Sequence, residues 1–261
     1  MLDPDPPEGS LDGMSVGLHH ACGRRSDGGV LCWGYEEGER RLGPLGLVAG
    51  TRASAGDVTD LGFGPAGVVE IAAGGRHTCL GDLDGHVQCI GDNRYGQTLA
   101  PMFALHGLEA GLDFTCGLDE KSLPVCWGLG RHGQLEAPAV PLQGLALGRA
   151  AACGLDPKGV VVCWGKPEHP GNGSAPSDEG WEELSAGATY VGAERFCARR
   201  GPETRCWAFN TPAGDAPQGL VALALGGDHA CGLDALSHPL CWVNDLVALR
   251  PLARPSYRWP D

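Results

Sequence analysis

The residues with the most chemistry to offer are twelve cysteines, because a thiol can form a disulfide, bind a metal ion or act as a nucleophile. They form six pairs, separated by nine or ten residues: Cys22 and Cys32, Cys79 and Cys89, Cys116 and Cys126, Cys153 and Cys163, Cys197 and Cys206, Cys231 and Cys241. No pair has the C-x2-C spacing typical of zinc sites. Six complete pairs favour disulfides and an oxidising compartment, with zinc ligation and reduced structural cysteines as the alternatives.

The elements that position these cysteines are predicted to be antiparallel strands. Asp84, in the turn-forming sequence Leu-Asp-Gly, lies halfway between Cys79 and Cys89, as expected for a hairpin in which the cysteines face each other. Opposed residues in a non-hydrogen-bonded pair have Cα atoms about 4.5 Å apart, a separation that a disulfide tolerates. Pro124 has the same strand parity as Cys126, where the missing N–H would cost no ladder bond.

Other residues repeat in phase with the cysteine pairs. Tryptophan follows the second cysteine in five of the six units: Trp33, Trp127, Trp164, Trp207 and Trp242. Because neighbouring strand residues point to opposite faces, we expect these tryptophans to pack where successive units meet. A glycine also precedes each pair at a regular position: Gly17, Gly74, Gly111, Gly148 and Gly226, with either Gly187 or Gly192 in the fifth unit. We assign Gly187, because it lies 39 residues from both Gly148 and Gly226.

Each unit contains short segments of β-branched and apolar residues separated by turn residues, and no unit carries a helical apolar stripe. The second unit has three such strands and an expected fourth within 101–107. The predicted fold class is therefore all-β, a β-propeller of six four-stranded blades with one disulfide in each blade; seven blades is the alternative. We expect a single domain over 1–261, with 1–13 as a linker or leader remnant. The repeats are expected near 14–47, 67–101, 105–138, 142–173, 181–212 and 220–250.

Composition narrows the range of partners. The formal net charge is −13 and no long basic run occurs, so the electrostatic field disfavours nucleic acid. No stretch approaches eighteen apolar residues, which excludes a membrane-inserted helix, and the N-terminal MLDPDPPEGS lacks the features of a signal peptide.

Residues 74–97 read GGRHTCLGDLDGHVQCIGDNRYGQ. Their G-x-x-H-T-C start, D-G turn and final G-Q resemble the regulator-of-chromosome-condensation repeat family, in the cysteine-paired form of bacterial secreted or surface proteins. The resemblance implies a β-propeller, but that family includes nucleotide-exchange factors, a plant ultraviolet photoreceptor and an inhibitor of β-lactamases. Gly75 stands where the photoreceptor has a tryptophan, which argues against that role.

Two other patterns could bind metal, and both have a simpler explanation. His20, His77 and His229 recur two residues before the first cysteine of their units, but Phe114 and Ala151 take the same position elsewhere, so we interpret the histidines as structural. The D-L-D-G sequence at 82–85 lacks the later ligands of an EF-hand and is interpreted as a turn. No catalytic motif is present, so we expect neither an enzyme nor a cofactor.

The segments after each second cysteine vary from unit to unit, as a recognition surface requires. Because equivalent loops of a propeller lie on one rim, they are predicted to form one protein-binding face that contains Tyr35, Arg94, Tyr95, Arg131, His132 and Phe209. The predicted function is a non-catalytic, protein-binding propeller in an extracellular, cell-surface or periplasmic location. A diffusible inhibitor of an extracellular enzyme is the alternative, and an enzyme with a central pocket is less favoured.

Overall fold

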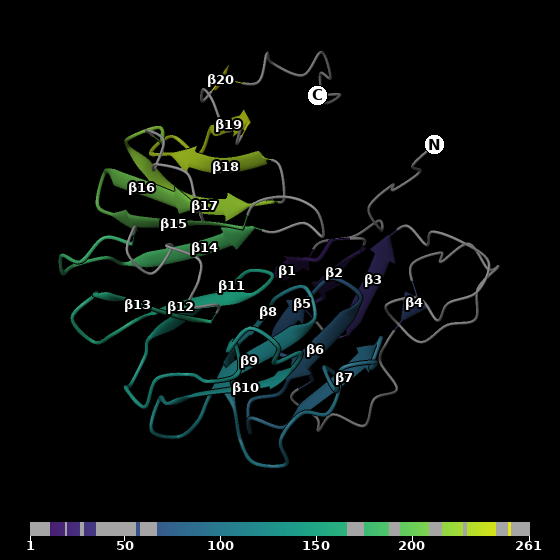
Figure 1. Cartoon of the computed structure of the whole chain (residues 1–261). Coiled ribbons are helices and arrows are strands. Elements are labelled where there is room, and N and C mark those ends of the chain that lie inside the picture. The colour runs from purple at the N-terminus through teal and green to yellow at the C-terminus, as the bar shows by residue number, and fades with distance from the viewer. Residues whose placement is uncertain are drawn as a thin grey trace.

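The structure, a computed structural model, describes residues 11–18, 20–26, 29–34, 56–57, 67–165, 175–187, 194–208, 216–226, 229–243 and 250–251. Within these ranges the regular secondary structure is β-strand, arranged in six antiparallel sheets that succeed one another in chain order (Figure 1). The all-β prediction is confirmed. In the described part of the chain, no helix is long and apolar enough to cross a membrane.

The first three sheets are formed by β1 (Gly13–Val16), β2 (His20–Arg24), β3 (Val30–Gly34) and β4 (Gly56–Asp57); β5 (Glu70–Ala73), β6 (His77–Gly81) and β7 (Val87–Gly91); and β8 (His106–Ala110), β9 (Phe114–Leu118) and β10 (Pro124–Gly128). The last three are formed by β11 (Gly144–Leu147), β12 (Ala151–Leu155) and β13 (Val161–Gly165); β14 (Glu183–Gly187), β15 (Arg195–Arg200) and β16 (Glu203–Ala208); and β17 (Leu220–Leu225), β18 (His229–Asp234), β19 (Pro239–Val243) and β20 (Arg250–Pro251).

A fourth strand is found in the first and last sheets, as β4 and β20. In the second sheet the strand expected within 101–107 is not formed, and residues 101–105 are irregular up to the start of β8 at His106. Pro101 has no N–H to donate to a ladder, and the N–H of Leu105 instead bonds to the carbonyl oxygen of Gly85 at 2.9 Å. That bond ties the segment to the β6–β7 hairpin.

The cysteine register agrees with the prediction in all six sheets. The members of each pair are directly opposed across the second and third strands, from Cys22 opposite Cys32 to Cys231 opposite Cys241. All six pairs are disulfides and no cysteine is free. The alternatives of zinc ligation and reduced thiols are thereby set aside.

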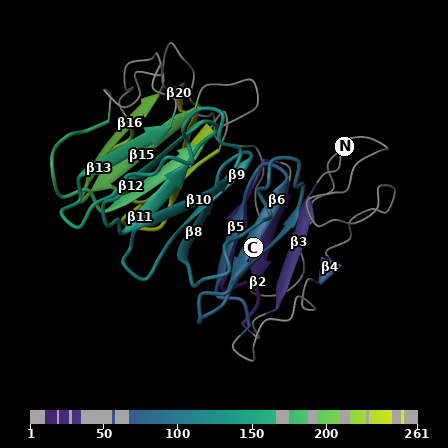
Figure 2. The same cartoon turned by 60° about the horizontal axis from the view of Figure 1, so that its bottom comes forward.

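The first strands of the sheets lie next to one another in chain order, from β1 and β5 to β14 and β17. Figures 1 and 2 show the sheet β11–β13 between the sheets β8–β10 and β14–β16. The first strands line a central cavity of about 540 Å³, and its lining includes one residue from the same position of each sheet: Val16, Ala73, Ala110, Leu147, Ala186 and Leu225.

The phased glycines allow the sheets to approach closely at this cavity. A Cβ atom at Gly74 would lie within 3.0 Å of the carbonyl oxygen of Gly111, closer than real Cβ atoms come. A Cβ atom at Gly187 would meet the oxygen of Gly226 in the same way, so the assignment of Gly187 to the repeat is confirmed. The glycines are therefore required by packing and need no phosphate ligand to explain them.

Contacts between neighbouring sheets involve the predicted tryptophans and histidines. Trp127, Trp164, Trp207 and Trp242 are buried, each in a cluster with residues of the preceding sheet or the segment leading from it. His77 Nε2 lies 2.8 Å from Thr115 Oγ1 in the next sheet, and His20 Nε2 lies 2.6 Å from Thr78 Oγ1. Burial is the main reason that the pKa of His77 falls to about 4, so this side chain is neutral near pH 7. The structural interpretation is confirmed for His20 and His77; the side chains of His229 and Trp33 lie outside the described residues.

Candidate functional site

Two kinds of connection lie at the same end of each sheet because the strands alternate in direction. The turn from the first to the second strand and the loop after the third strand both lie at the same end of a sheet. Backbone bonds join them: the N–H of Asp92 donates to the oxygen of Arg76 at 2.8 Å, and that of Leu129 donates to the oxygen of Asp113 at 2.9 Å. We call this end of the sheets the loop face.

Buried glutamines fix the two best described loops. Gln97 and Gln134, the last residues of their G-Q sequences, are fully buried. Gln97 Oε1 accepts a bond from the N–H of Tyr95 at 2.9 Å, and its backbone oxygen accepts the indole N–H of Trp127 at 3.0 Å. Gln134 repeats the arrangement one sheet later, with the N–H of His132 and the indole of Trp164. Each loop is thereby attached to the buried tryptophan of the next sheet.

The loops and turns enclose a cavity of about 390 Å³ on the loop face. It is lined by the residues Arg76, Arg94, Tyr95, Asp113, Leu129, Arg131, His132 and Arg149. Four of the six residues predicted for the binding face therefore lie together in one cavity, whereas Tyr35 and Phe209 lie outside the described residues.

The sequence-based selection missed three charged residues of this cavity: Arg76, Asp113 and Arg149. They belong to turns between first and second strands, close after the phased glycines, whereas the prediction considered only the loops after the second cysteine. The available signal was the strand alternation itself, because it places both kinds of connection on one face.

The ring of Tyr95 lies near two guanidinium groups. The Arg94 guanidinium is 5.7 Å and that of Arg131 is 5.8 Å from the centre of its ring, within the range of cation–π attraction. Arg94 is held from the other side by Asp92, with Nε 2.9 Å from Oδ1 and 2.7 Å from Oδ2. Burial opposes ionisation of Asp92, but the hydrogen bonds from Arg94 and the positive charges of Arg94 and Arg76 together outweigh it and lower the pKa of the carboxyl group.

Asp113 lies in a different environment. Its Oδ1 is buried and has no hydrogen-bond partner within the part of the chain that the structure describes. Burial raises the pKa of Asp113 even though Arg94, Arg76 and Arg149 act in the opposite direction. The residues that line the cavity offer four guanidinium groups, one imidazole, one carboxyl group and the aromatic surface of Tyr95.

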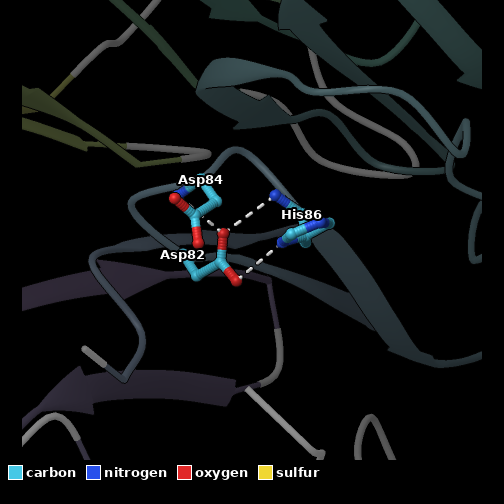
Figure 3. Close-up of side chains that lie close together, drawn as sticks. All are labelled: Asp82, Asp84 and His86. Atoms are coloured by element: carbon cyan, nitrogen blue, oxygen red, sulfur yellow. Dashed lines mark hydrogen bonds and ion pairs between the residues drawn. The ribbon is translucent and has the colours of Figure 1, made fainter. Parts of the chain in front are cut away.

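The hairpin at the opposite end of the second sheet brings Asp82, Asp84 and His86 together (Figure 3). Asp82 Oδ1 accepts the N–H groups of Asp84 and His86 at 2.9 Å each, and Oδ2 lies 3.1 Å from His86 Nδ1. The same carboxylate-to-backbone bonds recur in three further hairpins, at Asp119, Asp156 and Asp234. The interpretation of D-L-D-G as a turn is confirmed, because this carboxylate is used to close the hairpin.

Comparison with protein families decides the identity of the repeat. Residues 68–97 match the family model of the regulator of chromosome condensation (RCC1) repeat. This segment of the chain is similar to an RCC1 repeat. The matched residues run from just before β5 to Gln97, so they include one disulfide, His77 and the glutamine that holds the loop. A search of the curated proteins found no match.

Several solved structures share the fold of this chain. The CRINKLY WD40 ectodomain of the Arabidopsis thaliana receptor kinase ACR4 is 23% identical, with a TM-score of 0.66 over 95% of this chain and 84% of that one. Human WBSCR16 is 13% identical, with a TM-score of 0.71 over 92% and 78%. Yeast RCC1 (Prp20), solved bound to Kap60, is 15% identical, with a TM-score of 0.65 over 90% and 70%. Identities this low show the fold alone.

Proposed function

We propose that this chain is a non-catalytic β-propeller that binds another protein through its loop face. The observation that carries the proposal is Tyr95, 37% exposed, flanked by Arg94 and Arg131 on loops that buried glutamines attach to the core. Tyrosine and arginine are the residues most often found as anchors of protein interfaces. A rigid frame also reduces the entropy lost on binding. Yeast RCC1, of the same fold, was solved bound to the protein Kap60, which is consistent with this role.

We further propose an extracellular, cell-surface or periplasmic location. Six disulfides that use all twelve cysteines are typical of proteins that fold in an oxidising compartment. The similarity to the ectodomain of ACR4 supports the same conclusion. The unreduced protein isolated from its native location should be lighter than the reduced protein by twelve hydrogens, two for each disulfide. A native protein with twelve free thiols would contradict this location.

We also propose that the ring of six sheets closes between the first and last sheets, and that each blade has four strands. The central cavity receives residues from all six sheets. Leu118 and Leu155, two residues after the first cysteine of their units, are 3% and 5% exposed beneath the tryptophan of the next sheet. Leu233 has the same position in the last sheet and is 38% exposed, so closure would cover it with the first sheet.

Closure can be tested at Leu233. In a closed ring, Leu233→Asp should lower the melting temperature by several degrees, whereas Leu236→Asp, at a position 75% exposed in the β18–β19 hairpin, should leave it unchanged. Equal melting temperatures for the two variants would indicate an open ring.

The binding face is tested by replacing Tyr95 and Arg131 together with alanine. The immobilised protein would be used to capture its partner from the native extracellular and envelope fractions, and affinity would then be measured with the purified partner. We expect the affinity to fall roughly thirtyfold or more, because truncated anchors typically cost about 2 kcal/mol or more. The matched control is Lys121→Ala, an exposed side chain on the hairpin at the opposite end of the third sheet. Equal affinities for wild type and the double variant would refute this face.

A further inference from the structure

The loop-face cavity is strongly cationic in a protein that is acidic as a whole. Four arginines line it, Arg76, Arg94, Arg131 and Arg149, against a single carboxylate in the lining, that of Asp113. The formal net charge of the whole chain is −13. Because charges separated by more than about 8 Å are screened at physiological ionic strength, a small ligand in the cavity experiences mainly these guanidinium groups.

Two of the four arginines are available for an incoming group. Arg94 is engaged with Asp92. Arg131 and Arg149 are exposed, and within the part of the chain that the structure describes neither forms a salt bridge. The nearby carboxyl group of Glu194 is buried, and its Oε1 accepts the N–H groups of Ala150 and Ala151 at 2.7 and 2.8 Å.

Arg131 is partly oriented before a ligand arrives. Its guanidinium lies near the ring of Tyr95. The backbone N–H of Tyr95 donates in turn to Oε1 of the buried Gln97. Orientation before binding leaves less side-chain entropy to lose on association. A planar guanidinium presents paired N–H groups that match the two oxygens of a carboxylate.

We propose that this cavity binds an acidic segment of a protein, with aspartate or glutamate carboxylates held by Arg131 and Arg149 and the segment lying against Tyr95. This proposal rests on the proposed function and specifies the chemistry of the partner at the same face. A cavity of about 390 Å³ has room for one or two side chains. A nucleic acid duplex or an anionic membrane surface is far larger than this cavity, so most of its charges would face a protein whose net charge is −13 and would be repelled.

The test measures binding of a fluorescent hexaglutamate peptide to the intact protein, with hexaglutamine of equal length as the neutral probe. Hexaglutamate should bind, hexaglutamine should not, and the affinity should fall as sodium chloride is raised. Arg131→Gln and Arg149→Gln should each weaken hexaglutamate binding by about tenfold, which corresponds to about 1.4 kcal/mol. Lys121→Gln removes one positive charge from the opposite end of the third sheet and should have no effect.

Arg131→Lys separates paired hydrogen bonding from charge. The lysine retains the positive charge but not the planar donors, so the hexaglutamate affinity of this variant should lie between those of wild type and Arg131→Gln. Thermal unfolding of each variant establishes that it is folded.

Three results would overturn the proposal. The first is hexaglutamate binding that is unaffected in both glutamine variants. The second is binding of inorganic pyrophosphate without binding of hexaglutamate, which would indicate a phosphate site. The third is tighter binding of a short DNA duplex or of phosphatidylserine vesicles than of the peptide.

Failure of this proposal can be distinguished from failure of the proposed function. A captured partner that depends on Tyr95 and Arg131, together with unchanged hexaglutamate binding in both glutamine variants, would leave the binding face intact and overturn its acidic specificity. Hexaglutamate binding with the expected losses, together with a partner unaffected by the Tyr95 and Arg131 replacements, would support an anion site and overturn the proposed face.

Discussion

The strands and the loop face of the second and third repeats hold their residues in different ways. His77 is fully buried and bonded to Thr115 of the next sheet, and the glycines beside the central cavity admit no Cβ atom. Tyr95 and Arg131, only a few residues away in sequence from these strands, are exposed and contact each other side chain to side chain. The difference indicates that close packing resides in the strands, and the proposed binding residues lie in exposed loops, so each should be alterable with little effect on the other.

The largest expected effect on the strands is that of Gly111→Ala. The added Cβ atom would lie within 3.0 Å of both the Gly148 oxygen and the ring of Phe114, so two sheets must separate. We expect a loss of about 3 kcal/mol in the free energy of unfolding, measured with urea. Gly144→Ala is the matched control, because a Cβ atom there meets nothing within 4 Å. Similar stabilities for the two variants would mean that close packing at the cavity is not required.

Removing one disulfide should have the next largest effect. Replacing Cys116 and Cys126 together with alanine opens a loop closed over a separation of ten residues and should cost about 2–3 kcal/mol of unfolding free energy. Hexaglutamate affinity should remain within about twofold of wild type, since neither Cys116 nor Cys126 lines the cavity. A large loss of affinity in a folded variant would show that strands and loops are not separable.

The pH dependence of stability should reveal Glu194, which links the fifth repeat to the start of β12. Burial raises its pKa to about 7, so the folded state favours the protonated form. The folded protein then binds more protons than the unfolded chain between about pH 4.5 and 7, and its stability falls as the pH rises through that range. The free energy of unfolding of wild type, measured with urea, should fall across this range by on the order of 2 kcal/mol more than that of Glu194→Gln.

His77 titrates with the opposite sign. Its pKa of about 4 in the folded state lies below its unfolded value, so its contribution to stability is present above pH 6.5 and is lost as the pH falls through 4. Both proteins contain His77, so the comparison of wild type with Glu194→Gln isolates the carboxyl group. Parallel stability curves for the two proteins would contradict the raised pKa.

The smallest expected effect lies where strand and loop meet. Trp127→Phe removes the indole bond to the oxygen of Gln97, the residue that holds Tyr95, and should cost about 1 kcal/mol of unfolding free energy. Trp242→Phe is the control, because the buried indole N–H of Trp242 has no hydrogen-bond partner within the described residues. Trp242→Phe should therefore lower the free energy of unfolding by less than Trp127→Phe does. An equal cost in thermal unfolding would show that ring packing, and not the hydrogen bond, decides stability here.

The sequence by itself determined the features that repeat along the chain. The cysteine register, the packing of the tryptophans against the preceding sheet and the choice of Gly187 all followed from fixed spacing, because strand alternation places residues of equal parity in equivalent positions. Arg94, Tyr95, Arg131 and His132 could be selected for the same reason, since they follow the same strand of successive repeats.

Only the tertiary structure decided which charged groups share the cavity. Arg76, Asp113 and Arg149 join the predicted residues because three sheets converge at the loop face, and no spacing within one repeat states how close the next sheet comes. The tertiary structure also explains why no strand forms within 101–105, because the N–H of Leu105 bonds to the β6–β7 hairpin. Local periodicity specifies the strands, whereas distances between side chains of different repeats depend on how the sheets pack around the central cavity.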